Sequence, residues 1–288
     1  MAISRNQLVK ELEPGLNALF GLEYKQYENQ AAEIYTTESS DRAFEEEVML
    51  SGFASARVKP EGSGVAFDNA QETFTARYTN ETIALAFAIT EEAIEDNLYD
   101  RLASRYTKAL ARSMASTKQV KGASTLNNGF GTFQSGDGVA LFSTAHPTIA
   151  GTFSNTLATA ADLNETSLEQ ALIDIAALTD ERGLKIAAKG VKMIIPSALQ
   201  FTAERLMKSQ GRVSTADNDV NAIRSMGMIP QGYRVNNYLT DTDAFFITTD
   251  VPNGMKHFNR APLTTKMEGD FDTGNVRYKA RERYVFGV

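Results

Sequence analysis

The sequence contains no cysteine, no tryptophan and only two histidines, His146 and His257, among its 288 residues. Without cysteine it has no disulfide, thiolate metal site, iron–sulfur cluster or cysteine nucleophile. Its longest clearly apolar run, Ile83–Ile89, is far shorter than the roughly 20 residues that a membrane helix requires. The first residues also lack the apolar core of a signal peptide. We therefore expect a soluble protein of a reducing compartment, without a membrane partner.

The chain is mildly acidic, with 29 Lys+Arg against 36 Asp+Glu and a formal net charge of −7. This balance argues against general nucleic-acid binding, which requires a positive footprint. Hydrophobic residues make up 42% of the sequence, enough for an ordered core. The length predicts about two compact units, or one unit with long extensions.

Motifs for catalysis or ligand binding are incomplete. A glycine-rich stretch lacks the Gly-Lys-Ser/Thr of a phosphate loop, and a calcium-like loop from Asp217 has Ala222 and Met228 where glycine and glutamate are needed. His146 lies near hydroxyls but outside any Gly-x-Ser-x-Gly motif, so we interpret it as a loop histidine satisfied by backbone groups. His257 has no partner at metal-ligand spacing. We predict no enzymatic activity, no cofactor and no catalytic or metal-binding residue, although so many acids always permit a carboxylate pair.

The first half of the chain contains two helical patterns. The N-terminal pattern predicts short amphipathic helices broken at Pro14-Gly15, followed by a polar extended arm as far as Ser40. An N-terminal helix packed on its own domain fits this pattern equally well. Farther along, Thr90 resembles an N-cap, and apolar residues recur every fourth position from Ile94 to Met114. They predict a spine helix over Glu91–Lys121, about 45 Å long.

Charges along the predicted spine helix are sorted by sign. Acids such as Glu91 and Glu92 occupy its start, and cations from Arg101 to Lys121 follow. The helix dipole explains only the charges in the first and last turns. The remaining charges indicate either a solvated face or staggered contacts between copies of the chain.

Two alternating segments, 73–78 and 83–89, predict long antiparallel strands around a flexible, protruding loop that begins near Glu45, Glu46 and Glu47. Because an isolated hairpin is only marginally stable, we expect a neighbour to cover it.

The second half alternates helices with strands, which predicts a mixed α/β domain. A helix preceded by capping-box spacing at Thr166–Glu169 should end near Gly183. The further expected elements are a buried strand at 191–195, a helix at 197–208, and strands at 234–238, 244–248 and 275–286.

Four cations alternate along the last strand and therefore share one face. Because they repel one another, this face should contact acids or nucleic acid; a basic face in plain solvent is the other interpretation. The acids could come from the same subunit or from the next. The candidate subunit-interface residues are Arg277, Lys279, Arg281, Arg283, Glu45, Glu46, Glu47, Glu91 and Glu92.

The order of arm, hairpin, long helix, α/β domain and returning strand resembles the major capsid proteins of tailed bacteriophages, the Hong Kong ninety-seven phage fold. Among these, the sequence is most similar to the Mu-like major head subunits. The resemblance spans nearly the whole chain. It rests on four segments, at Ile89–Tyr99, Leu141–Pro147, Val191–Leu199 and Tyr238–Phe246.

The resemblance implies an α+β major-capsid fold with an N-terminal arm, an extended β-hairpin loop, a spine helix, a peripheral domain and an α/β axial domain. The implied boundaries are 1–43 for the arm, 44–82 for the extended loop, 83–128 and 251–288 for the peripheral domain, and 129–250 for the axial domain. It implies a homo-oligomer of pentamers and hexamers that closes into an icosahedral shell around double-stranded DNA, without sequence-specific DNA binding. An encapsulin-type compartment and a soluble α/β enzyme are the alternatives.

The resemblance also implies partners and a location. The sequence lacks the long charged N-terminal extension that serves some relatives as a built-in scaffold, so a separate scaffolding protein is expected, together with a portal and a decoration protein. Lys59 lies in the loop that certain relatives cross-link, but no partner motif accompanies it, so we expect no cross-link. Localisation would be the virion, after assembly in the host cytoplasm.

Overall fold

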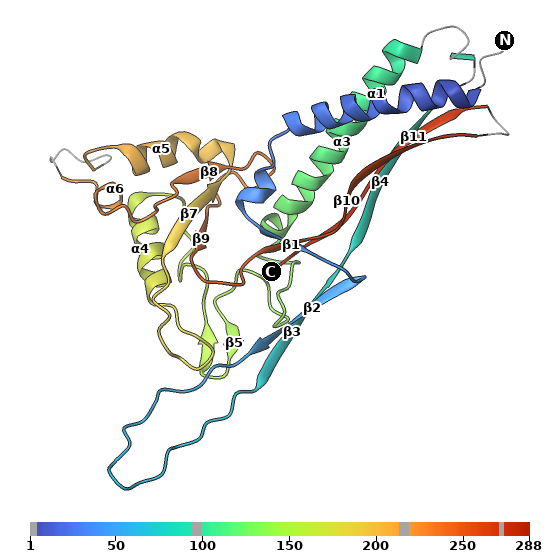
Figure 1. The fold of residues 1–288 in the computed structure, drawn as a ribbon. Coiled ribbons are helices and arrows are strands. Elements are labelled where there is room, and N and C mark those ends of the chain that lie inside the picture. The colour runs from blue at the N-terminus through green and yellow to red at the C-terminus, as the bar shows by residue number, and fades with distance from the viewer. Residues whose placement is uncertain (1–4, 91, 94–98, 213–218, 271–273) are drawn as a thin grey trace. The chain divides into compact units, whose positions relative to one another are not determined.

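The computed structural model describes residues 5–90, 92–93, 99–212, 219–270 and 274–288 (Figure 1). The chain forms two compact units. Unit 1 combines Met1–Glu45, Tyr78–Gly122 and Lys256–Gly287, and unit 2 combines Glu46–Arg77 and Ala123–Met255 with the last residue. Within the described ranges, no helix is both long and apolar enough to cross a membrane.

Unit 1 is built on a four-stranded sheet with the order β1-β10-β11-β4. Strand β1 runs parallel to β10, whereas β10, β11 and β4 are antiparallel to one another. The four strands are β1 (Thr36–Ser39), β4 (Glu81–Ile89), β10 (Lys256–Gly269) and β11 (Val276–Gly287).

One face of this sheet carries the core of unit 1. Tyr278 and Ala280 point inward from β11 and pack against Leu110 and Met114 of helix α3 (Tyr99–Asn127). Helix α1 (Arg5–Gln26) contributes to the same core, and the short 3-10 helix η1 (Gln30–Glu33) follows it. Every second residue of β11 therefore points into this core, and the residues between them point to the opposite face of the sheet.

Helix α1 continues through Pro14, so the predicted break at Pro14-Gly15 is wrong. An internal proline costs a helix about 3 kcal/mol. Burial of Leu16 and Phe20 beyond it offsets this cost, since each large apolar side chain contributes about 1.5–3 kcal/mol. These buried residues agree with the alternative of an N-terminal helix packed on its own domain.

Helix α3 extends past the predicted end at Lys121 to Asn127. Gly122 does not break it, because the glycine allows η1 to approach closely: a Cβ at this position would lie 2.7 Å from the Cβ of Ala31. The expected start at Glu91 and the acids beyond Ala93 lie outside the described residues or side chains. The Thr90 hydroxyl accepts a hydrogen bond from the Ala93 amide at 3.4 Å, which is the geometry of the predicted N-cap.

The two segments predicted as antiparallel strands belong to different sheets. Strand β3 (Glu72–Thr79) pairs with β2 (Phe44–Leu50), on the other side of the loop formed by residues 51–71. Strand β4 instead pairs with β11, because its inward residues require a helix-covered sheet. Between β3 and β4, the buried Asn80 side chain donates hydrogen bonds to Ser40 and to the Arg42 carbonyl.

Unit 2 contains a three-stranded sheet with the order β8-β7-β9. Its central strand β7 (Gly190–Ile195) confirms the predicted buried strand, with Met193 and Ile195 in the core beside Leu168. The other elements are β8 (Tyr233–Val235), β9 (Phe246–Thr249), α4 (Glu165–Ala176), η2 (Ser197–Leu199), α5 (Gln200–Lys208) and α6 (Ala222–Met226).

Three local expectations for unit 2 are wrong. The capping box of α4 is formed by Asn164 and Ser167, two residues before the predicted pair. The helix ends at Ala176, and Gly183 lies in a later turn with a φ of 80°. The glycine-rich stretch contains a small hairpin of β5 (His146–Thr148) and β6 (Gly151–Phe153).

Candidate functional site

The four cations of β11 form a row on the outward face of the unit 1 sheet, and we call Arg277, Lys279, Arg281 and Arg283 the cationic row. The first three are exposed and Arg283 is half-buried, while the residues between them are buried, as the alternation predicts. Within the described chain, Arg277 is the only cation of the row with an acidic partner, and it forms an ion pair with Asp270. The Nε of Arg283 is buried without a hydrogen-bond partner.

A strip of small side chains lies beside the cationic row. Ala84, Ala86 and Ala88 of β4 are the register partners of Arg281, Lys279 and Arg277, and all three alanines are exposed. Directly paired residues of antiparallel strands point to the same face. The row therefore borders a strip of exposed alanines on the same face of the sheet.

The predicted acidic residues have other partners in the subunit. Glu45 accepts a hydrogen bond from Ser40 at 2.7 Å, and this bond lowers the pKa of Glu45. Glu46 pairs with Arg77 across the β2–β3 ribbon at 3.1 Å. Glu47 lies on the same strand, Glu92 is exposed, and Glu91 lies outside the described residues. The predicted pairing of these acids with the cationic row stays a prediction about contacts between subunits.

The inward face of β11 holds an ion pair that the sequence analysis missed. Glu282 is 2% exposed and accepts a hydrogen bond from Lys118 of α3 at 3.3 Å. Burial raises the pKa of Glu282, although the Lys118 charge opposes that shift. The ammonium also lies 4.9 Å from the ring centroid of Tyr284. Glu282 alternates with the cations, so its inward position could have been read from the same period of two.

His257 of β10 is buried close to this pair. Its ring stacks on Phe286, with 4.7 Å between the ring centroids, and its Nδ1 lies 3.3 Å from the Thr37 hydroxyl. Burial, followed by the nearby Lys118 charge, lowers the pKa of His257 to about 4. The histidine is therefore neutral at neutral pH and acts as an aromatic core residue.

This burial predicts an acid-sensitive unit 1. An unfolded chain binds the proton of His257 near the ordinary pKa of 6.5, whereas the folded chain binds it only near 4, so stability is lost as the pH falls through that window. At about 1.4 kcal/mol for each pH unit, the loss across this window is at most on the order of 3–4 kcal/mol. We expect His257→Phe, which keeps the stacking, to flatten this part of the dependence of the urea midpoint on pH. An unchanged dependence would show that His257 does not cause it.

His146 has a carboxylate partner, so its interpretation as a loop histidine satisfied by backbone groups is wrong. Its Nδ1 lies 2.6 Å from Asp137 Oδ2, and Ser135 donates to the other oxygen of Asp137 at 2.5 Å. Burial acts to raise the pKa of Asp137, but hydrogen bonds from Ser135, His146 and the Val139 amide together lower it. The Nε2 of His146 is buried without a hydrogen-bond partner, so no hydroxyl among the described residues is bonded to this nitrogen. The pair fixes the turn before β5 to that strand.

The loop at 51–71 is held at its base and exposed along its length. Arg182 donates from Nε to the Gly52 carbonyl at 3.2 Å and from Nη2 to the Asn69 carbonyl at 2.7 Å. Beyond this clamp, Val58 is 95% exposed and Phe67 is 97% exposed. These two side chains leave large apolar surface uncovered within the described subunit.

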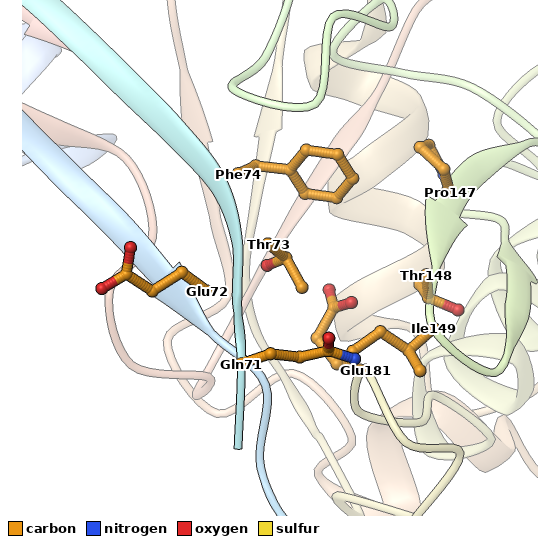
Figure 2. Close-up of a pocket in the computed structure, with 8 residues that line it drawn as sticks. All are labelled: Gln71, Glu72, Thr73, Phe74, Pro147, Thr148, Ile149 and Glu181. Atoms are coloured by element: carbon orange, nitrogen blue, oxygen red, sulfur yellow. The ribbon is translucent and has the colours of Figure 1, made fainter. Parts of the chain in front are cut away.

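A surface cavity of about 250 Å³ lies at the foot of the same loop, within unit 2 (Figure 2). We call it the foot cavity. Its walls come from the start of β3, from the β5–β6 hairpin and from the turn that carries Glu181. The lining residues are Gln71, Glu72, Thr73, Phe74, Pro147, Thr148, Ile149 and Glu181. Among the side chains that the structure describes, no group of three or more histidines or acids is placed to hold a metal ion.

Comparison with known families identifies the fold. A family profile described as phage capsid protein matches residues 72–288. The chain belongs to the phage capsid protein family. No curated protein sequence matches the chain.

Solved structures share the fold of this phage capsid family member at low sequence identity. The capsid of bacteriophage JBD30 decorated with minor capsid protein trimers is 12% identical, with a TM-score of 0.57 over 74% of this chain and 92% of that chain. The capsid of an empty GTA particle is 15% identical, with a TM-score of 0.54 over 89% and 84% of the two chains. A virus-like particle from Pyrococcus furiosus is 9% identical, with a TM-score of 0.54 over 95% and 93%. The α+β major-capsid fold is thereby confirmed.

Proposed function

We propose that the chain is the major head subunit of a tailed phage, which assembles as pentamers and hexamers into an icosahedral shell enclosing double-stranded DNA. The family match over residues 72–288 carries this proposal, because it extends from β3 to the C-terminus and includes parts of both units. The uncovered apolar side chains of the loop support it. A shell subunit needs complementary surfaces and no reactive site.

The proposal gives each segment a role. Residues 1–43 act as the N-terminal arm, whose helix α1 packs on its own subunit, and 44–82 act as the extended loop, which laps over a neighbouring subunit. Residues 83–128 and 251–288 form the peripheral domain, and 129–250 form the axial domain at the capsomer centre. The division of the chain into two compact units supports this assignment, with α1 packed in unit 1.

The partners follow from the shell. A separate scaffolding protein, a portal and a decoration protein would meet it during assembly in the host cytoplasm, and the finished subunit would reside in the virion. The minor capsid protein trimers on the JBD30 capsid support the decoration partner. Kinship with Mu-like head subunits rests on the four sequence segments given above.

The second candidate function is a shell of the same fold that encloses proteins in place of DNA. The likeness to the Pyrococcus furiosus particle favours a protein-filled compartment of the encapsulin type. The phage capsid family match favours DNA as the content.

Electron microscopy of the purified chain, alone and with a candidate scaffolding protein, tests the proposal. We expect closed icosahedral shells, and DNA-filled particles from infected cells. Persistent monomers under every assembly condition would contradict the shell. Particles filled with protein in place of DNA would select the encapsulin-type compartment.

A further inference from the structure

The foot cavity contains a carboxylate that lacks a counter-charge. Figure 2 shows the Glu181 carboxylate facing the same space as Phe74, Pro147 and Ile149, whereas Glu72 points away from it. The Oε2 atom of Glu181 is buried without a hydrogen-bond partner. No cation pairs with Glu181 among the residues that the structure describes. Burial raises the pKa of Glu181, and the negative charges of Asp180 and Asp137 raise it further. A hydrogen bond from the Ile149 amide acts in the opposite direction but does not cancel the increase.

These features define the chemistry of an occupant. Glu181 is half-buried as a residue, but its Oε2 atom is shielded from solvent, and such a partly desolvated carboxylate favours a compensating cation. The apolar part of the remaining wall comes from Phe74, Pro147 and Ile149, and its polar part from uncharged side chains such as Thr73 and Thr148. An aromatic ring such as that of Phe74 is a group that attracts cations. A lysine or arginine side chain meets all of these demands, because its methylene stem covers apolar walls while its charged end reaches the carboxylate.

The exposed loop supplies such side chains. Arg57 and Lys59 flank Val58 near the loop tip, and neither has an ion-pair partner in the described part of the chain. In an extended segment, residues two apart point to the same side, so both cations can approach one surface. Within unit 2 the loop tip projects away from the β5–β6 hairpin (Figure 1), so the tip does not fill its own cavity. A loop tip that enters this cavity therefore belongs to another copy of the chain.

We propose that the Arg57–Lys59 tip of one subunit inserts a cationic side chain into the foot cavity of a second copy, where it pairs with Glu181. This proposal deepens the proposed shell function and rests on it. Under this proposal each subunit carries two complementary parts. The cationic tip of its loop binds another copy, and the foot cavity at the base of the same loop receives the tip of another copy. A chain of such contacts can link successive subunits.

Charge-removing variants test the anchor. We expect Glu181→Gln to raise the subunit concentration needed for assembly by about tenfold, the effect of losing one charge pair. Arg57→Gln with Lys59→Gln should have the same effect, and combining all three changes should add little, since both sets remove one interaction. Glu61→Gln, at the same loop tip, is the matched control and should leave assembly unchanged.

The isolated subunit gives a readout that a merely structural Glu181 would not produce. Because burial disfavours its charge, Glu181→Gln should leave the Tm of the unassembled subunit unchanged or higher while assembly weakens. A fall in Tm that accounts for the assembly defect would overturn the anchor. Additive effects of the two variant sets would overturn it as well.

Disulfide trapping supplies a direct test because the chain has no cysteine of its own. We expect Lys59→Cys combined with Thr148→Cys, at the cavity rim, to give covalent multimers on non-reducing gels of oxidised shells. Thr148→Cys combined with Ser209→Cys, which places the second thiol at the end of α5, should stay monomeric. Shells that form normally without this cross-link would refute the anchor and leave the proposed function intact, whereas failure of the unmodified chain to form shells would refute the function itself.

Discussion

Arg281→Glu with Arg283→Glu is expected to abolish shell assembly while the subunit remains folded. The cationic row has an acidic partner only at Arg277 within the described subunit, so its other charges are available to a neighbour. Reversing two of them replaces attraction by repulsion, and like charges brought together at an interface cost several kcal/mol. Electron microscopy and sedimentation velocity of the variant should show free subunits where the unmodified protein gives particles.

The half-buried Arg283 requires a second variant. Its Nε lies in the interior, so a glutamate there can also destabilise the sheet. Lys279→Glu with Arg281→Glu changes exposed side chains only, beside Ala86 and Ala84, and should leave the thermal melt unchanged. Normal particles from this second variant would reject the row as a subunit contact. Normal empty shells that package less DNA would instead assign the row to nucleic acid.

The fold was predictable wherever a simple period was strong. Alternation along β11 and the apolar β7 both gave the correct strands. Strand β10 was missed because its stretch around Thr264–Lys266 is polar and its pairing with β11 is shifted at two places. The buried stripe of α3 was predicted in part: Leu110 and Met114 belong to the predicted apolar repeat and lie in the core. The buried alanines Ala111 and Ala115 were missed, because they pack closely but give little hydrophobic signal.

The candidate site was predictable only in part. The sequence identified the cationic row, because its spacing lies within one strand. Contacts between distant segments were not accessible: Lys118 and Glu282 meet across 164 positions, and His146 finds Asp137 through a turn that no motif marks. The foot cavity likewise combines three separate segments, so the burial of Glu181 Oε2 without a partner emerges only from their packing.

Lys118→Met should destabilise unit 1 by about 3–5 kcal/mol at neutral pH, the cost of leaving one partner of a buried ion pair uncompensated. Glu282 would keep its charge in the sheet interior, where one of its oxygens already lacks a hydrogen-bond partner. Methionine retains the length and most of the packing of the lysine stem, so the loss would report charge more than volume. Urea unfolding of the unassembled subunit, followed by circular dichroism, measures the effect.

The pH dependence separates this charge effect from a packing defect. Burial already raises the pKa of Glu282 above its ordinary value of 4.5, and removal of Lys118 raises it further. A carboxyl group with a raised folded-state pKa keeps its stability contribution below its unfolded pKa and loses it as the pH rises toward the folded value. The deficit of Lys118→Met should therefore be small at acidic pH and grow toward neutrality. Adding Glu282→Gln should recover most of the deficit and remove its pH dependence, because a neutral pair leaves no buried charge; a deficit that is equal at all pH values and persists in the double variant would show that Lys118 acts through packing alone.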